Sequence, residues 1–397
     1  MSTITIAVVQ QMSRVHESPE AYQADVKRFM RQVKSKYADI VVFPELSGLM
    51  LAYPLISGVK RGLLKRADKG SSRRASPLSR VLGRVAGTTA GALGSGMRGS
   101  LVRLLRKRHG ELFDTYSSFF SAVAAEYGMY VVGGSIYLYD EGLDEVRNAS
   151  YLFDPQGKIV GYQEKLVLNR QDKGICSPGD SVQVLHTDLG RLGVVIGSDL
   201  LYPEPARAMA VNGADLLIAP AACSGPVMHR QVSDAFKTRV EENQLFGAIS
   251  FLVGPNNLGD GQYAGKSGVL APVELTAKYT GVLQRVGANN VEGFVVSECD
   301  LDSLQKFQEQ SNPSLRHNMP LACGPVLSGF YAEGKTISEG VQLPELEWEK
   351  DIAPASETMN LDEPDIVVSE ESETFETASD DKPLTSSEKT SWPFESE

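Results

Sequence analysis

The sequence of 397 residues predicts an α/β fold, and two patterns indicate it. Short apolar runs rich in β-branched residues, such as 40–43 and 192–196, are too brief for helices and are typical of buried strands. Amphipathic helical patterns separate such runs, as at 19–36 and 113–127. This alternation predicts a sheet covered by helices.

The composition describes an ordinary globular protein, with 42% hydrophobic and 22% charged residues. The net charge of −11 argues against a nucleic-acid binder. Four cysteines (Cys176, Cys223, Cys299 and Cys323) have irregular spacing, which predicts neither a disulfide framework nor a metal site, and we expect no cofactor. Because the first residues lack the basic start of a signal peptide, we expect a reducing, cytoplasmic setting.

The chain opens with a strand at 3–10, the helix 19–36 and the buried strand 40–43. Glu45 follows that strand within Phe-Pro-Glu-Leu, at the strand end where α/β folds place functional groups. On spacing alone, a catalytic carboxylate and a helix cap are equally good interpretations of Glu45.

The stretch 55–110 interrupts this order. Residues 60–108 carry fourteen Lys or Arg against one acid, Asp68, a net charge of +13, and the segment 100–109 is predicted as a short basic amphipathic helix. A surface insertion is the simplest interpretation. An anionic membrane surface is the second, which would make the protein peripheral to the membrane, and nucleic acid is a weak third because aromatic residues are absent.

The α/β pattern resumes with the helix 113–127 and a strand at 129–136 that ends at glycines. Residues 147–160 predict a hairpin around the turn Asp154-Pro-Gln-Gly. Lys165 follows it. Taken alone, a lysine in this place is most often a solvated surface residue.

Residues 190–204 predict an elbow, in which a buried strand ends at Gly197-Ser198 and Pro203-Glu204 open a helix over 204–212. In hydrolases, such a strand–turn–helix elbow presents a nucleophile above the sheet. A strand at 214–218, a helix over 236–249 and strands at 249–253 and 293–299 follow.

Phe-Pro-Glu at 43–45, Lys165 after the Asp-Pro-x-Gly hairpin, and Asp199-Leu-Leu-Tyr-Pro-Glu in the elbow resemble, in order, motifs of the nitrilase (carbon–nitrogen hydrolase) superfamily. The resemblance implies a four-layer α-β-β-α sandwich over 1–310 that associates into dimers or larger oligomers. It makes Glu45 the general base and Lys165 the oxyanion donor. The family's catalytic cysteine position holds Gly197. Asp172 is the nearest carboxylate where many members carry a second Glu.

Glycine supplies no nucleophile, so each neighbouring candidate has to be weighed. Ser198 should point away from the site, because adjacent side chains alternate along an extended strand. Cys223 and Cys176 could approach the site, although a small buried thiol is the commoner interpretation of Cys223. The expected pocket also includes Asp199 and Tyr202, and the missing side chain of Gly197 is expected to enlarge it.

The remaining chain divides into an extension at 311–338 and a tail at 339–397 that carries eighteen acids against three lysines and is predicted to be disordered.

Three functions follow from these features. The first is a pseudoenzyme that binds a small amide, nitrile, carboxylate or partner. The second is an amidohydrolase that uses an atypical nucleophile or water. The third is a membrane-surface scaffold that uses the basic insertion.

Overall fold

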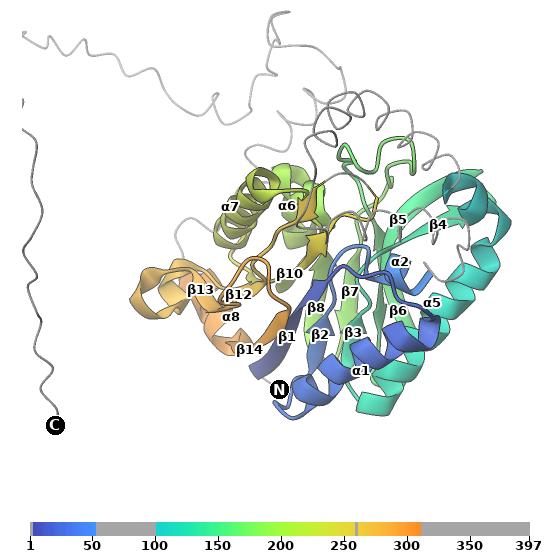
Figure 1. Ribbon diagram of the computed structural model, residues 1–397. Helices are drawn as coiled ribbons and strands as arrows, with labels where there is room; N and C mark the ends of the chain where they lie inside the picture. The colour runs from blue at the N-terminus through green and yellow to red at the C-terminus, as the bar shows by residue number, and fades with distance from the viewer. Residues whose placement is uncertain (1–2, 53–100, 259–260, 311–397) are drawn as a thin grey trace, which may run out of the picture. The chain divides into compact units, whose positions relative to one another are not determined.

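The computed structural model describes residues 3–52, 101–258 and 261–310 (Figure 1). The core of the predicted basic insertion, the extension 311–338 and the acidic tail 339–397 lie outside these residues. Among the described helices, none combines the length and apolar character needed to cross a membrane.

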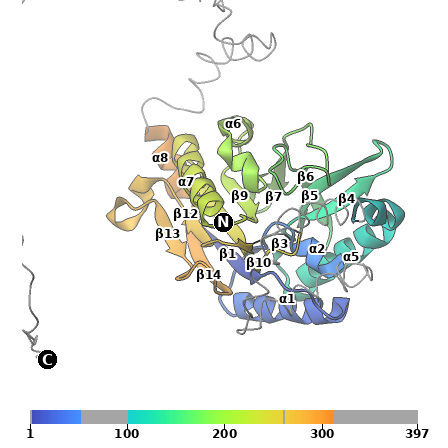
Figure 2. The same cartoon turned by 45° about the horizontal axis from the view of Figure 1, so that its top comes forward.

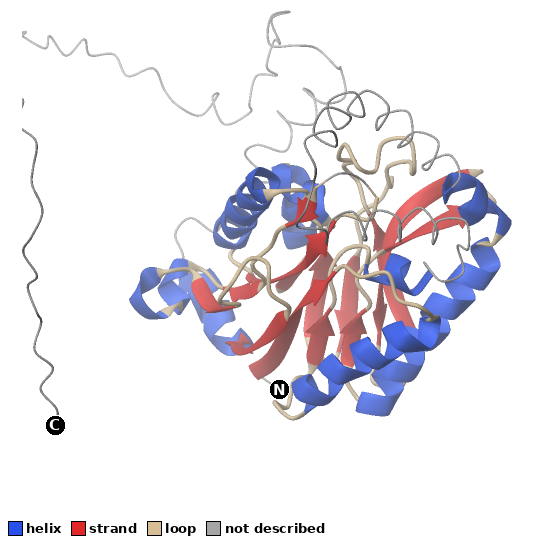
Figure 3. Cartoon of the chain, viewed as in Figure 1, coloured by secondary structure: helices blue, strands red, loops and turns tan. Residues whose placement is uncertain are grey.

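Helices and strands alternate over residues 3–52, as predicted, and the helix at 109–127 is then followed by four consecutive strands (helices blue, strands red in Figure 3). Their bounds are β1 (Thr3–Met12), α1 (Pro19–Lys34), β2 (Ile40–Val42), α2 (Ser47–Ala52), α5 (His109–Tyr127), β3 (Tyr130–Val132), β4 (Ile136–Asp140), β5 (Glu145–Phe153) and β6 (Ile159–Glu164). The second part contains β7 (Val184–Thr187), β8 (Gly190–Val194), the 3₁₀ turn η2 (Gly197–Leu201), α6 (Pro203–Val211), β9 (Leu216–Ala221), α7 (Pro226–Asn243) and β10 (Phe246–Pro255). The last elements are β11 (Gln262–Tyr263), β12 (Gly268–Leu270), the 3₁₀ turns η3 (Val273–Leu275) and η4 (Ala277–Tyr279), β13 (Val282–Arg285), β14 (Gly293–Asp300) and α8 (Leu301–Gln310).

Local chemistry explains where several elements begin and turn. The Ser18 hydroxyl caps α1 by accepting from Ala21 N, and Pro19 occupies its first turn. The predicted hairpin is confirmed as β5–β6, where Asp154 Oδ1 accepts from the backbone N–H groups of Gln156 and Lys158. These contacts involve near neighbours in the chain, which is why sequence patterns could predict them.

The strands form one hydrogen-bonded sheet that folds over at β1. This strand pairs with β2 along one half of the sheet and, at Gln11 and Met12, with Leu252 and Val253 of β10 in the other half. The strand order is β4-β5-β3-β2-β1-β10-β9-β8-β7. The neighbouring strands from β3 through β8 in this order pair in parallel, and the pairs at both ends of the order are antiparallel. The fold-over brings the two halves of the sheet face to face.

Three hydrophobic cores separate four layers, which confirms the predicted sandwich. Alternate residues of β1 face opposite ways: Ile6 and Val8 join the core between the sheet halves, whereas Ala7 and Val9 join the core under α1 and α5. A third core packs α6 and α7 against the other half. Figure 2 shows α1 and α5 on one side of the strands and α6 and α7 on the other.

One predicted helix has the wrong bounds. The helix expected over 236–249 is α7, which begins ten residues earlier and ends at Asn243. Gln244 adopts a left-handed conformation, with φ of 53°, and β10 begins at Phe246. Gly247 shows the reason: a Cβ atom there would lie 2.3 Å from Val240 Cγ2, so this strand passes directly beneath the helix.

The last part of the predicted insertion, from residue 101 onwards, lies within the described residues. Residues 101–107 are helical, as predicted for 100–109, but Leu101 and Leu105 are buried in the core shared with α1 and α5. Arg106 forms an ion pair with Asp144, and Arg108 forms one with Glu111. Leu101 and Leu105 on the apolar side of this helix are therefore covered by the domain.

Candidate functional site

Glu45 leaves the end of β2 and projects into the protein interior, where its side chain is 2% exposed. Its Oε1 accepts from Lys165 Nζ at 2.6 Å and from Asn148 Nδ2 at 3.1 Å, and its Oε2 accepts from Ala222 N at 2.8 Å. Burial raises the pKa of Glu45, and the positive charge of Lys165 opposes that rise. The next residue, Leu46, has φ of 65°, so the chain turns sharply directly after the carboxylate.

Lys165 follows β6 and lies fully buried between two carboxylates. Its Nζ is 2.6 Å from Glu45 Oε1 and 2.6 Å from Asp172 Oδ2. Burial by itself lowers the pKa of Lys165, but the charges of Glu45 and Asp172 more than compensate and raise it above the usual value. The ammonium therefore stays protonated and can stabilise negative charge but cannot act as a base.

Asp172 has a shorter side chain than the glutamate that the resemblance implies, and yet it reaches Lys165. Its Oδ1 accepts from Tyr137 OH at 2.7 Å, and its Oδ2 accepts from Asn169 N at 3.1 Å as well as pairing with Lys165. The loop after β6 carries both Lys165 and Asp172, and it turns back so that the two side chains meet.

Gly197 begins the elbow turn η2 with φ of 53°, a left-handed conformation that favours glycine. A Cβ atom placed on it would lie only 2.5 Å from Glu45 Oε2. The sequence led us to expect that the missing side chain of Gly197 enlarges a pocket. The structure shows instead that other atoms fill this space. The Glu45 carboxylate occupies the space into which a side chain at this position would project.

Ser198 and Asp199 join the elbow to the segment that follows Lys165. The Ser198 hydroxyl donates to Val167 O at 2.6 Å. Asp199 accepts from the backbone N–H groups of Leu166, Val167 and Ile196 at 2.7–3.0 Å. Burial raises the pKa of Asp199 to about 7, against the lowering effects of Lys165 and of these N–H groups. Both side chains are committed to structure, and neither is free to act as a nucleophile.

The two cysteines considered as candidate nucleophiles, Cys176 and Cys223, are poorly suited to that role. Cys223 is buried beside Ala222, and burial together with the charge of Glu45 raises the pKa of its thiol. Burial and the charge of Asp172 also raise the pKa of the Cys176 thiol, and its Sγ lies 3.9 Å from Asp172 O. A reactive thiol requires a lowered pKa. Tyr202, which was expected to line the pocket, precedes α6 and is 50% exposed.

Sequence analysis missed three groups that surround Glu45 and Asp172: the Asn148 side chain, the Tyr137 hydroxyl and the Ala222 N–H. Asn148 offered one signal, because asparagine is depleted within strands and it lies inside the predicted hairpin. The Ala222 contact depends on backbone position and has no side-chain signature.

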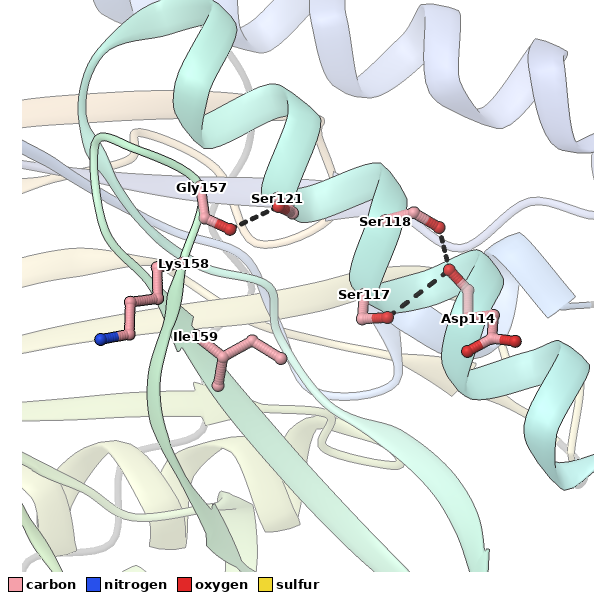
Figure 4. Close-up of a pocket in the computed structure, with 7 residues that line it drawn as sticks. All are labelled: Asp114, Ser117, Ser118, Ser121, Gly157, Lys158 and Ile159. Carbon is pink, nitrogen blue, oxygen red and sulfur yellow. Dashed lines mark hydrogen bonds between the residues drawn. The ribbon is translucent and has the colours of Figure 1, made fainter.

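Neither a metal site nor a second catalytic centre emerges from the described residues. No group of three or more His, Cys, Asp or Glu residues within them could hold a metal ion. A surface pocket of about 520 Å³ lies between α5 and the β5–β6 turn (Figure 4). The pocket contains none of the site residues, and its Ser118 and Ser121 hydroxyls donate to backbone carbonyls. Its lining residues are Asp114, Ser117, Ser118, Ser121, Gly157, Lys158 and Ile159.

Residues 5–273 match the family model described as carbon–nitrogen hydrolase. The chain is 30% identical over 204 residues to the probable hydrolase YhcX of Bacillus subtilis, a match that covers 50% of this chain and only 39% of the Bacillus protein. It is 29% identical over 204 residues to the omega-amidase NIT2 of Homo sapiens, covering 48% of this chain and 68% of that protein.

Solved structures show the same fold. The structure of Nit3 from Saccharomyces cerevisiae, a member of branch 10 of the nitrilase superfamily, matches with a TM-score of 0.55 at 19% identity, covering 79% of this chain and 96% of Nit3. A carbon–nitrogen hydrolase from Helicobacter pylori matches with a TM-score of 0.58 at 20% identity, covering 82% and 98% of the two chains.

Proposed function

Since the chain belongs to the carbon–nitrogen hydrolase family, we propose that its amidase-like domain binds a small ligand at the Glu45–Lys165 centre without hydrolysing it. The observation that carries this proposal is the position of Glu45 Oε2, 2.5 Å from where a Cβ atom on Gly197 would lie. Glu45, at the position of the family's general base, thus faces Gly197, which has no side-chain proton that a base could accept.

The chemistry of acyl transfer supports this proposal. Cleavage of an amide through a covalent intermediate requires a nucleophile, a base beside it and a donor for the oxyanion. Glu45 and Lys165 could supply the base and the donor. The nucleophile is absent at 197, and the raised thiol pKa values of Cys176 and Cys223 leave neither as a thiolate.

A hydrolase that uses water directly is the competing function. The raised pKa of Glu45 favours it, because a carboxylate with a higher pKa is a stronger base. It would forgo the covalent intermediate, and Glu45 would have to activate the water while held by three donors.

The deciding experiment measures ammonia release from a panel of amides, nitriles and N-carbamoyl compounds by the full chain and by Glu45→Gln. We expect no release from either protein, together with thermal stabilisation of the full chain by at least one panel compound. Release by the full chain that Glu45→Gln abolishes would overturn the proposal in favour of the water mechanism.

We also propose that the domain self-associates through the α6–α7 layer. Three exposed apolar side chains belong to these helices or directly precede them: Val227 is 71%, Tyr202 50% and Val211 44% exposed. Contiguous exposed apolar surface marks interaction sites, and a second copy of the chain would cover these side chains if the α6–α7 layer pairs. Light scattering after size-exclusion chromatography tests this self-association, and we expect a dimer or larger species. Substitution of Val227 and Val211 by Lys should shift the oligomeric state towards the monomer.

A further inference from the structure

The buried centre holds more carboxyl groups than cations in contact with them. Glu45 and Asp172 share one ammonium, that of Lys165, at 2.6 Å each. The third carboxyl, Asp199, is held by backbone N–H groups and not by a cationic side chain. All four residues are at most 1% exposed, so water screens these charges poorly.

Asn148 provides an independent sign that a hydrogen-bond donor is missing from this centre. Its side chain is 1% exposed, and its Oδ1 has no hydrogen-bond partner, whereas its Nδ2 donates to Glu45 Oε1 at 3.1 Å. That contact fixes the orientation of the amide, because the reverse orientation would place two oxygens against each other. A buried acceptor without a donor is costly, and a ligand or a water that supplies an N–H or O–H group would satisfy it.

Glu45 has remaining acceptor capacity as well. A carboxylate oxygen can accept two hydrogen bonds, and the donor that holds Oε2 is Ala222 N. This oxygen faces Gly197, where no side chain covers it. The unused acceptors therefore belong to Asn148 and to the carboxylate that Asn148 contacts.

A negatively charged ligand would meet an unfavourable field here. The third hydrogen of the Lys165 ammonium could contact it, but the two carboxylates that flank the ammonium already offset its charge. A carboxylate ligand would also offer no donor to Asn148 Oδ1.

We propose that this centre selects a planar, cationic N–H donor, an amidinium or guanidinium group, over a carboxylate. The planar fork of such a cation suits a carboxylate acceptor, and its positive charge would stabilise the ionised forms of carboxyl groups that outnumber the single ammonium. This inference rests on the proposed function of the site as a binding centre, and it narrows the class of ligand that the centre accepts.

Three ligands of nearly equal shape test the charge preference: acetamidine, acetamide and acetate. Each has four non-hydrogen atoms, and they present a cation, a neutral amide and an anion. Binding to the full chain is measured by NMR titration at constant ionic strength and neutral pH, up to about 100 mM, because ligands of this size bind weakly. We expect acetamidine to bind at least about tenfold more tightly than acetate, with acetamide between them.

Two variants locate the effect. Glu45→Gln removes one charge at nearly constant shape and should reduce the preference for acetamidine over acetate. Asn148→Leu removes the unpartnered acceptor and should weaken acetamidine and acetamide while leaving acetate unchanged. Unfolding curves of both variants verify folding, and the ligand series on the unmodified chain decides the question if either variant is unstable.

The outcomes separate this inference from the proposed function. Equal or tighter binding of acetate overturns the cation preference and leaves a binding centre in place. Ammonia release from acetamide that Glu45→Gln abolishes overturns the proposed function, whichever ligand binds best. Failure of all three ligands to bind overturns the cation preference, and the larger panel of amides, nitriles and N-carbamoyl compounds then decides the proposed function.

Discussion

Substitution of Gly197 tests whether the Glu45 carboxylate is fixed in the space beside the elbow. In Gly197→Ala, a Cβ atom must be held at φ of 53°, which costs about 1–2 kcal/mol. The atom would also lie 2.5 Å from Glu45 Oε2 and displace the carboxylate from Ala222 N. Loss of that charge-assisted hydrogen bond adds about 1.5–3 kcal/mol. We therefore expect Gly197→Ala to lower the free energy of unfolding by about 2.5–5 kcal/mol.

Gly174 provides the matched control. It has φ of 79°, but no heavy atom lies within 4 Å of the position of its Cβ. Gly174→Ala should therefore cost only the backbone term of about 1–2 kcal/mol. Urea unfolding measures both variants, with Glu45→Ala/Gly197→Ala closing a double-mutant cycle in which the second substitution should cost less than in the parent chain.

Equal costs for Gly197→Ala and Gly174→Ala would refute this reasoning. Such a result would mean that the carboxylate moves away freely when a side chain appears. Gly197→Cys would then be expected to restore a thiol beside an undisturbed base. If instead the costs differ as expected, restoring a cysteine also requires Glu45 to give up its contact with Ala222.

Three further predictions concern the rest of the domain. Lys165→Met leaves two buried carboxylates without their shared cation and should cost about 3–5 kcal/mol in urea unfolding, whereas a cost below about 1 kcal/mol would contradict the buried ion pairs. Leu105→Ala should cost about 2–5 kcal/mol because Leu105 is fully buried, with Lys107→Ala, on the exposed side of the same helix, near zero as its control. For Asp25, burial raises the pKa but hydrogen bonds and ion pairs with neighbouring His and Arg side chains lower it to about 2 from 3.8. Its stabilisation is therefore present above pH 3.8 and lost as the pH falls towards 2. After allowance for solvent screening, Asp25→Asn should cost about 1 kcal/mol at pH 7 and only a small fraction of that at pH 2, where half of the native carboxyls are still ionised, and an equal cost at both would count against this.

The sequence alone determined the features that depend on neighbours in the chain. Residues 40–43 predicted a buried strand by their length and branching, and the turn at Asp154 predicted the β5–β6 hairpin. The order of motifs around Glu45, Lys165 and Gly197 indicated the family, which the family model over residues 5–273 confirms. In each case the signal is local periodicity, turn chemistry or residue identity, which tertiary contacts did not override.

Only the tertiary structure decided what these residues touch. Glu45 and Lys165 are 120 positions apart, and Glu45 and Ala222 are 177 apart, so no local pattern encodes their contacts. The placement of the carboxylate beside Gly197, against the expectation of an enlarged pocket, follows from donors on separate elements. The sequence likewise placed Leu105 on the apolar side of a surface helix. In the structure it is buried in the core shared with α1 and α5. Periodicity specifies which face of an element is apolar, but packing between distant elements determines what covers that face and where each buried charge finds its partner.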